Sequence, residues 1–230
     1  MGHQRLALYV LLGVLVFGAV VSFLFGSYAY EVNRTHGFPL DDPWIHLQFA
    51  RNLHDYGSFS YYKDEMTTSG STSPLYTFML ALGFFVTSNE MMLSYVLGVL
   101  FLLGAAVYVY RIVVVQADPR SSFPVLAFGA AVLFLVEMRM QWAALSGMET
   151  TLFILLLLAV LYYYKVRTAL ALGIASGLLL WTRPEAVIMV AALALDALYH
   201  RLWVRRAREK SSHKQKRAER QLVQSPAFPL

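Results

Sequence analysis

Residues 6–30 decide the fold class, because LALYVLLGVLVFGAVVSFLFGSYAY is an unbroken apolar run of 25 residues. A membrane-spanning helix needs about 20 such residues, whereas the apolar region of a secretory signal has only roughly 7–15. We therefore predict a signal anchor that stays in the mature chain. Ser27-Tyr28-Ala29 loosely resembles a cleavage site, which leaves a cleaved signal as the alternative.

The composition of the whole chain is typical of a polytopic membrane protein. Hydrophobic residues make up 58% of the 230 residues and charged residues 14%, whereas a water-soluble domain carries about 25% charged residues. The chain has no cysteine, which excludes disulfides and thiolate metal sites. The net charge of +5 comes largely from residues 201–230. This pattern predicts a disordered basic cytoplasmic tail and no nucleic-acid partner.

Six apolar segments are predicted to span the membrane, which makes the fold an all-α helix bundle. They are residues 6–30, 91–110, 123–139, 148–166, 168–182 and 184–199. Residues 75–86 are also apolar, but a helix of this length reaches only about 18 Å. We expect them to belong to an interfacial or re-entrant helix over residues 74–87, with Ser73 as its N-cap and Pro74 at its first position.

The positions of Lys and Arg support this topology. When residues 75–86 do not span, 14 of the 19 basic residues lie on one side of the membrane, which the positive-inside rule makes the cytoplasmic side. We therefore predict a multi-pass protein of the cell membrane with both termini in the cytoplasm. The loop over residues 31–90 is then extracytoplasmic, and it is long enough to suggest a function of its own. An amphipathic helix over residues 43–56, lying in the interface, is predicted within it.

Three polar motifs that are far apart in the sequence come to the outer face in this topology. They are Asp41-Asp42, Ser146-Gly147-Met148-Glu149-Thr150 and Thr182-Arg183-Pro184-Glu185. Each has a structural explanation, because Asp42 before Pro43 suits an N-cap. Ser146 and Glu149 likewise fit a capping box, and Glu185 suits the start of a helix. Asp41 has no such role.

Arg183 and His46 each allow two interpretations. A cation inside the membrane costs roughly 2.5–3.5 kcal/mol at the centre and less at the edge. We therefore expect Arg183 to pair with Glu149 or Glu185, or to bind a phosphate, for which its planar guanidinium is suited. His46 lies four residues after Asp42 on the same side of a helix. It either assists a metal or proton site or is simply solvated.

Two adjacent carboxylates have two chemical uses. One is removal of a proton from a hydroxyl nucleophile, for which a neighbouring negative charge makes a carboxylate a better base. The other is ligation of Mg²⁺ or Mn²⁺ that holds a phosphate leaving group. Both uses indicate transfer chemistry at the membrane surface. A transporter is a further alternative, but no predicted span shows a central acidic or histidine relay. Asp196 is the only mid-span candidate, and it lies towards the cytoplasmic end of its span.

These motifs together resemble those of the GT-C superfamily of integral-membrane glycosyltransferases, in particular the branch that includes the mycobacterial terminal arabinofuranosyltransferases. The blocks that carry the resemblance are Asp41-Asp42-Pro43-Trp44-Ile45-His46, Phe49-Ala50-Arg51-Asn52-Leu53, Gly70-Ser71-Thr72-Ser73-Pro74-Leu75, Ser146-Gly147-Met148-Glu149-Thr150 and Thr182-Arg183-Pro184-Glu185. They occur in the family's order and extend over about residues 1–200. One departure is Ala186, which stands where a glycine is common.

The resemblance implies transfer of a sugar from a polyprenyl-phosphate donor to a hydroxyl of an extracytoplasmic glycan, lipid or protein. It makes Asp41 the general base and Asp42 its partner or a ligand of Mg²⁺ or Mn²⁺. Glu149 and Arg183 would line the same cavity, with Arg183 near the donor phosphate and oriented by Glu185. His46 would assist in substrate binding.

The family's members usually continue with further spans, and often with a soluble outer domain. We therefore expect a fragment, a minimal form, or a subunit that a second chain completes. The alternative function is a non-catalytic membrane protein that binds polyprenyl lipid or scaffolds a partner enzyme.

Overall fold

The computed structural model describes residues 2–63, 65–116 and 123–203, and these residues form nine helices and no strand. The helices are α1 (Gly2–Asn33), α2 (Asp42–Tyr56), α3 (Pro74–Gly83), α4 (Glu90–Gln116), α5 (Phe123–Val136), α6 (Met138–Ala144), α7 (Thr150–Val166), α8 (Ala169–Thr182) and a last helix, Ala186–Trp203. The chain divides into two compact units, residues 1–186 and 187–230. The predicted all-α fold is confirmed for the described residues.

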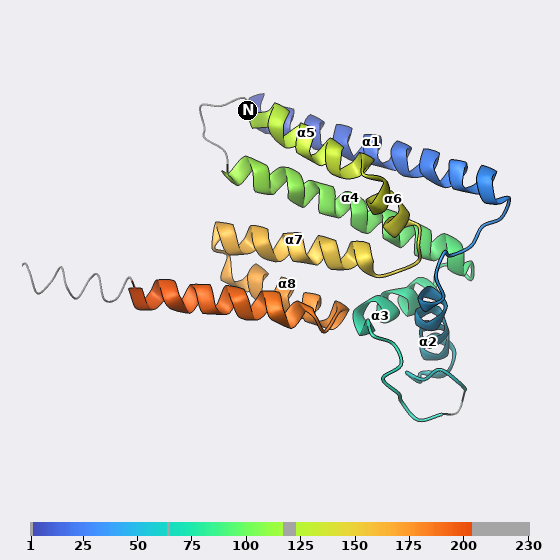
Figure 1. Cartoon of the computed structure of the whole chain (residues 1–230). Helices are drawn as coiled ribbons and strands as arrows, with labels where there is room; N and C mark the ends of the chain where they lie inside the picture. Colours follow the sequence, from blue (N-terminus) through green and yellow to red (C-terminus); the bar gives the residue numbers. More distant parts are fainter. Residues whose placement is uncertain (1, 64, 117–122, 204–230) are drawn as a thin grey trace, which may run out of the picture. The chain divides into compact units, whose positions relative to one another are not determined.

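In the first unit, α1, α5, α4 and α7 run side by side (Figure 1), and α8 packs against α7. Alanines fill much of the contact between α1, α4 and α5, among them the fully buried Ala106, Ala127 and Ala131. Small side chains let membrane helices approach closely, because van der Waals packing drives their association where no water is displaced. Gly98 on α4 lies directly against the backbone carbonyl of Ala144 at the end of α6.

A sharp bend separates α5 from α6, whose axes differ by 62°. Glu137 occupies the break and its carboxylate accepts a hydrogen bond of 2.9 Å from the Met140 amide, which caps α6. The buried Gln141 donates to the Leu135 carbonyl and accepts a hydrogen bond of 2.8 Å from Ser22 on α1. Polar backbone exposed by a break in an apolar helix must find a partner inside the protein. Gln141 supplies that partner and ties the break to α1.

The helices α2 and α3 lie together at one end of this bundle (Figure 1). Their shared core contains Leu47 and Ala50 from α2 and Tyr76 and Leu80 from α3, all almost fully buried. Gly57 ends α2 with a φ of 67°, a left-handed conformation that glycine adopts without strain. The two helices predicted in the long loop are thus present, although α3 stops at Gly83 and only turns continue beyond it.

Two predicted caps are wrong and one is right in position. Ser73 is the N-cap residue of α3 and Pro74 follows it, as predicted, although the Ser73 side chain makes no capping bond. The N-cap position of α2 belongs to Asp41 and not to Asp42, and its side chain makes no capping bond. Ser146 and Glu149 form no capping box, because the N-cap of α7 is Glu149 itself, without a side-chain cap. In each case the side chain is free or bonded to a partner that local sequence does not reveal.

Among the described residues, three helices are long and apolar enough to cross a membrane, namely Ala7–Asn33, Glu90–Gln116 and Ala186–Trp203. The bent pair α5–α6 makes a fourth if it counts as one span. The chain is therefore a candidate multi-pass membrane protein. Helices also occupy the other two predicted spans, but α7 has 17 residues and α8 has 14. They reach only about 26 and 21 Å, less than the roughly 30 Å hydrocarbon core.

The second unit is described only by its helix, which extends to Trp203 and has an apolar, mostly exposed surface. Most of the predicted basic tail, residues 204–230, lies outside the described residues.

We expect Gly98→Ala to destabilise the bundle, because a Cβ at this position would overlap the Ala144 carbonyl, which belongs to rigid backbone. The free energy of unfolding should fall by about 1–3 kcal/mol, as for other overpacked sites. Thermal unfolding of the detergent-solubilised protein measures this. The control is Gly173→Ala on α8, where a Cβ meets no atom within 4 Å. Equal stability of the two variants would contradict the close contact.

Candidate functional site

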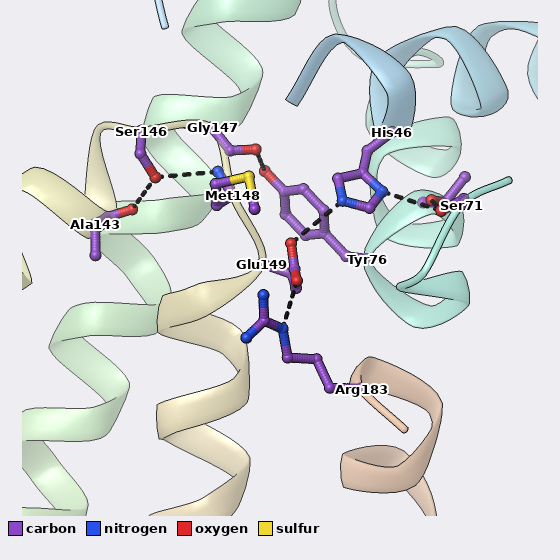
Figure 2. A network of polar contacts seen from close by, with 10 residues as sticks. His46, Ser71, Tyr76, Ala143, Ser146, Gly147, Met148, Glu149 and Arg183 are labelled. Carbon is purple, nitrogen blue, oxygen red and sulfur yellow. Dashed lines mark hydrogen bonds and ion pairs between the residues drawn. The ribbon is translucent and has the colours of Figure 1, made fainter. Parts of the chain in front are cut away.

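Four separated segments contribute side chains to one polar network at the end of the bundle where α2 and α3 pack (Figure 2). His46 comes from α2, Ser71 from the segment before α3, Glu149 from the residue before α7, and Arg183 from the residue after α8. Glu149 stands at the centre, with His46 and Arg183 on either side of its carboxylate. Two of the three predicted motifs are thus in direct contact, through Glu149 and Arg183, whereas the Asp41-Asp42 motif is not part of the network.

The Glu149 carboxylate is fully buried, and each of its oxygens faces a different partner. Nε of Arg183 donates to Oε1 at 2.6 Å, a short charge-assisted hydrogen bond. Nε2 of His46 lies 3.2 Å from Oε2, within ion-pair distance. Oε2 accepts no regular hydrogen bond, so this second contact is electrostatic. Arg183 is therefore the partner that makes a regular hydrogen bond.

Glu149 remains ionised despite its burial. The Arg183 guanidinium, whose Nε lies 2.6 Å from Oε1, favours the charged form of the carboxylate. Glu149 is therefore a fixed negative charge near neutral pH.

His46 is held from its other side by two hydroxyl groups. Its Nδ1 lies 3.0 Å from Oγ of Ser71, and that oxygen lies 2.7 Å from Oγ1 of Thr77 on α3. The ring of Tyr76 stands edge to face against the imidazole, with centroids 5.8 Å apart. All four side chains are buried. The imidazole is thus fixed in orientation and inaccessible to bulk water.

A tight turn at Gly147 directs Glu149 into this network. Gly147 has a φ of 76°, and a Cβ there would meet the Phe38 ring at 2.5 Å and Pro43 at 2.9 Å. Only glycine suits both the conformation and the space. The Tyr76 hydroxyl donates to the Gly147 carbonyl at 3.0 Å, which fastens the turn to α3. Ser146 completes it, because its hydroxyl donates to the Ala143 carbonyl at 2.8 Å.

The network lies deeper in the bundle than the charged start of α4. Gly104 on α4 packs against Leu155 on α7, and the Tyr108 hydroxyl donates to that of Tyr163, so the two helices run parallel. By this alignment Glu149 is level with residues 94–98 of α4, which is roughly 6–12 Å inward of Glu90. The ends of α7 and α8 are covered at this level by α3, whose Phe78 stacks on Trp181 at 5.9 Å.

Asp41 and Asp42 stay outside this network. Both are exposed, and neither carboxylate makes a hydrogen bond or ion pair with any residue that the structure describes. Pro43, the residue after Asp42, packs against the Gly147 turn and so links the acid pair to the buried network. The acid pair is therefore available to a solute.

Arg183 pairs with Glu149 and not with Glu185, so one of its two predicted partners is confirmed. Glu185 is exposed, and Glu149 is the residue that orients Arg183. His46 is neither solvated nor grouped with Asp42, as its contacts are Ser71 and Glu149. Among the described residues, no three His, Asp or Glu side chains are grouped as a metal site requires.

The sequence interpretation missed Ser71, Tyr76 and Thr77 as members of the site. Each lies in or next to the Gly70–Leu75 block, so the block itself was a usable signal. The hydroxyl groups themselves gave no signal in the sequence, because serine and threonine are common in loops and caps for other reasons.

Comparison of the chain with protein-family models, curated proteins and solved structures finds no match.

We expect Glu149→Gln to destabilise the first unit, because the neutral amide leaves the Arg183 guanidinium without its counter-charge and removes the carboxylate that faces His46. Loss of one partner of a buried ion pair costs roughly 3–5 kcal/mol. About 2 kcal/mol is a better expectation here, because Arg183 is 35% exposed and solvent screens it. Thermal unfolding in detergent measures the difference. Glu185→Gln is the control, and if it lowers stability as much, Glu149 is not the partner that matters.

Proposed function

We propose that the chain is a membrane glycosyltransferase that moves a sugar from a polyprenyl-phosphate donor to a hydroxyl acceptor. The observation that carries this proposal is the pair of free carboxylates, Asp41 and Asp42, beside a buried ionic group at the same end of the bundle. Exposed acids without partners next to a fixed cation are suited to transfer chemistry in which a hydroxyl loses a proton and a phosphate leaves.

Asp41 acts as the general base in this proposal. Its carboxylate accepts the proton of the acceptor hydroxyl while the oxygen forms a bond to the anomeric carbon of the donor sugar. The bond from that carbon to the phosphate oxygen breaks, and the electron pair leaves with the polyprenyl phosphate. Glu149 does not compete for the role of base, since Arg183 and His46 already occupy its two oxygens.

Arg183 stabilises the leaving phosphate. Its Nε is used by Glu149, but its two terminal nitrogens make no hydrogen bond or ion pair with the described residues. Those nitrogens are the part of the guanidinium that binds a phosphate through paired hydrogen bonds. Glu149 and His46 are positioning residues, because they hold the planar group without touching the substrate.

The expected Mg²⁺ or Mn²⁺ ion would have Asp42 as a ligand. The described residues around Asp42 supply no group of three ligands, so the residues present do not form a complete metal site. The proposed reaction has no step that depends on an ion.

The proposed orientation places the network and the acid pair outside the cytoplasm, with six spans and both termini in the cytoplasm. The opposite end of the bundle carries Arg111 near the Tyr162 ring, 5.9 Å from its centroid, and the hydrogen-bonded pair Tyr108 and Tyr163. Basic and aromatic side chains gather where a helix leaves the membrane, and the basic ones favour the cytoplasmic side.

A non-catalytic role is the second candidate, and one observation favours it. Glu149 and His46 have their polar partners within the protein. A structural connection between α2, α7 and α8 is enough to explain these contacts. A chain of this kind would bind polyprenyl lipid or scaffold a second chain. Turnover by the purified chain distinguishes the two functions.

We expect Asp41→Asn to lower the rate of sugar transfer by about 10²–10⁴-fold, the usual contribution of a general base. Stability should be unchanged, because the exposed carboxylate has no partner among the described residues. The measurement is transfer from a radiolabelled polyprenyl-phosphate sugar by reconstituted protein. Glu65→Gln, an exposed acid in the same loop, is the matched control. Retained transfer in the Asp41 variant would remove Asp41 as the base.

We also expect single cysteines to report the orientation, since the chain has no native cysteine. Met66→Cys, in the loop between α2 and α3 and 87% exposed, should react with a membrane-impermeant maleimide added outside intact cells. Thr168→Cys, between α7 and α8, should react only after the membrane is opened. The reverse pattern would invert the proposed orientation.

A further inference from the structure

A second site lies apart from the polar network, in a cavity of about 840 Å³ between α1, α4 and α6. None of His46, Glu149 and Arg183 lines it. On α1 its wall extends from Ala19 to Asn33, which is about 21 Å along the helix. Its volume is within the roughly 300–1,000 Å³ typical of small-ligand sites.

Most of this cavity is apolar. Phe23, Phe25, Val96, Val99, Trp142 and Leu145 form much of its wall. Small residues on α1, namely Ala19, Gly26 and Ala29, leave the space open. The hydroxyl of Ser22 is already bonded to Gln141, so it offers little to a water molecule. An apolar surface of this kind is suited to apolar solutes.

Polar groups gather at only one end of the cavity, where α1 ends. Glu31, Asn33, Thr35 and His36 line this mouth. Glu31 pairs with Arg34 at 2.9 Å, and His36 stacks on Tyr30 with ring centroids 4.5 Å apart. An apolar body with one polar mouth matches a solute that has a hydrocarbon chain and a polar head.

The position of the cavity favours a lipid chain as its occupant. The cavity follows the second half of a candidate membrane span, Ala7–Asn33, where lipid chains are the abundant solute.

The mouth of the cavity is next to the acid pair. Phe38 and Pro39 belong to its wall, and Asp41 is two residues further along the chain. Two residues span at most about 7 Å, so the polar head of a solute in the cavity is within reach of Asp41. We propose that the cavity holds the hydrocarbon chain of the acceptor, which makes the acceptor a lipid with a hydroxyl-bearing head group. Binding of a hydrocarbon chain in the cavity does not depend on the proposed function, whereas the role of that lipid as the acceptor rests on it.

The test is photolabelling of the full chain in nanodiscs with a palmitoyl glycerol that carries a diazirine in its acyl chain. We expect labelled peptides from residues 19–33 and from α6. Ala29→Trp fills the cavity and should lower this labelling about tenfold, equivalent to about 1.4 kcal/mol of binding. Val32→Trp is the matched control, because Val32 is exposed on the same helix but does not line the cavity. Ala19→Phe fills the inner end of the cavity and should lower the photolabelling as Ala29→Trp does.

Each outcome decides one part of the proposal. Labelling that both filling variants leave unchanged overturns the cavity as a lipid site. Loss of self-association in Ala29→Trp, with labelling intact, assigns the surface to a second copy and overturns it too. Competition by undecaprenyl phosphate but not by unlabelled palmitoyl glycerol overturns the acceptor assignment. Labelling should persist in Asp41→Asn, so a failure of the proposed catalytic role leaves this result interpretable.

Discussion

A carboxylate buried among apolar helices needs cations or hydrogen-bond donors close to it, and this constraint organises one end of the bundle. Glu149 meets the constraint with the Arg183 guanidinium and the His46 imidazole, each from a different part of the chain. The network therefore links α2 to the adjacent ends of α7 and α8. The Gly147 turn and the Tyr76 hydroxyl serve the same end, because they fix where the carboxylate points. The charges cost free energy to bury and in return specify a single arrangement.

The sequence predicted the grouping of these motifs better than their pairing. Apolar run length and the Lys and Arg pattern were sufficient to bring Glu149 and Arg183 to one side, because both signals are summed over many residues. The partner of a given side chain depends on a few ångströms of packing, which local pattern does not carry. His46 illustrates the difference, since its i+4 relation to Asp42 was real but its contacts are with Ser71 and Glu149. The failed caps at Asp42 and Ser146 have the same cause.

The lengths of α7 and α8 show why the number of spans was harder to predict. Both helices are apolar, yet both stop short of a full bilayer crossing. The structure accounts for the shortfall at the ends of α7 and α8 next to Glu149 and Arg183, where α3 packs and its Phe78 stacks on Trp181. Composition detects that a segment is apolar but not whether lipid or another helix covers its end. Where an interfacial helix covers the end of a short apolar helix, the length of that short helix alone does not show whether it spans the membrane.

Phe38 connects the two sites, and its position bears on how they would act together. Its ring packs against the Gly147 turn that directs Glu149, and it also lines the cavity beside α1. Trp44 and Tyr95 hold the ring edge to face, with centroids 5.0 and 5.6 Å away. The Phe38 ring thus lies between the apolar cavity and the Glu149 network, and the acid pair follows it by only a few residues. In the proposed reaction, a lipid head group at the cavity mouth and a charged donor near Arg183 would each keep their own environment until the reacting atoms meet.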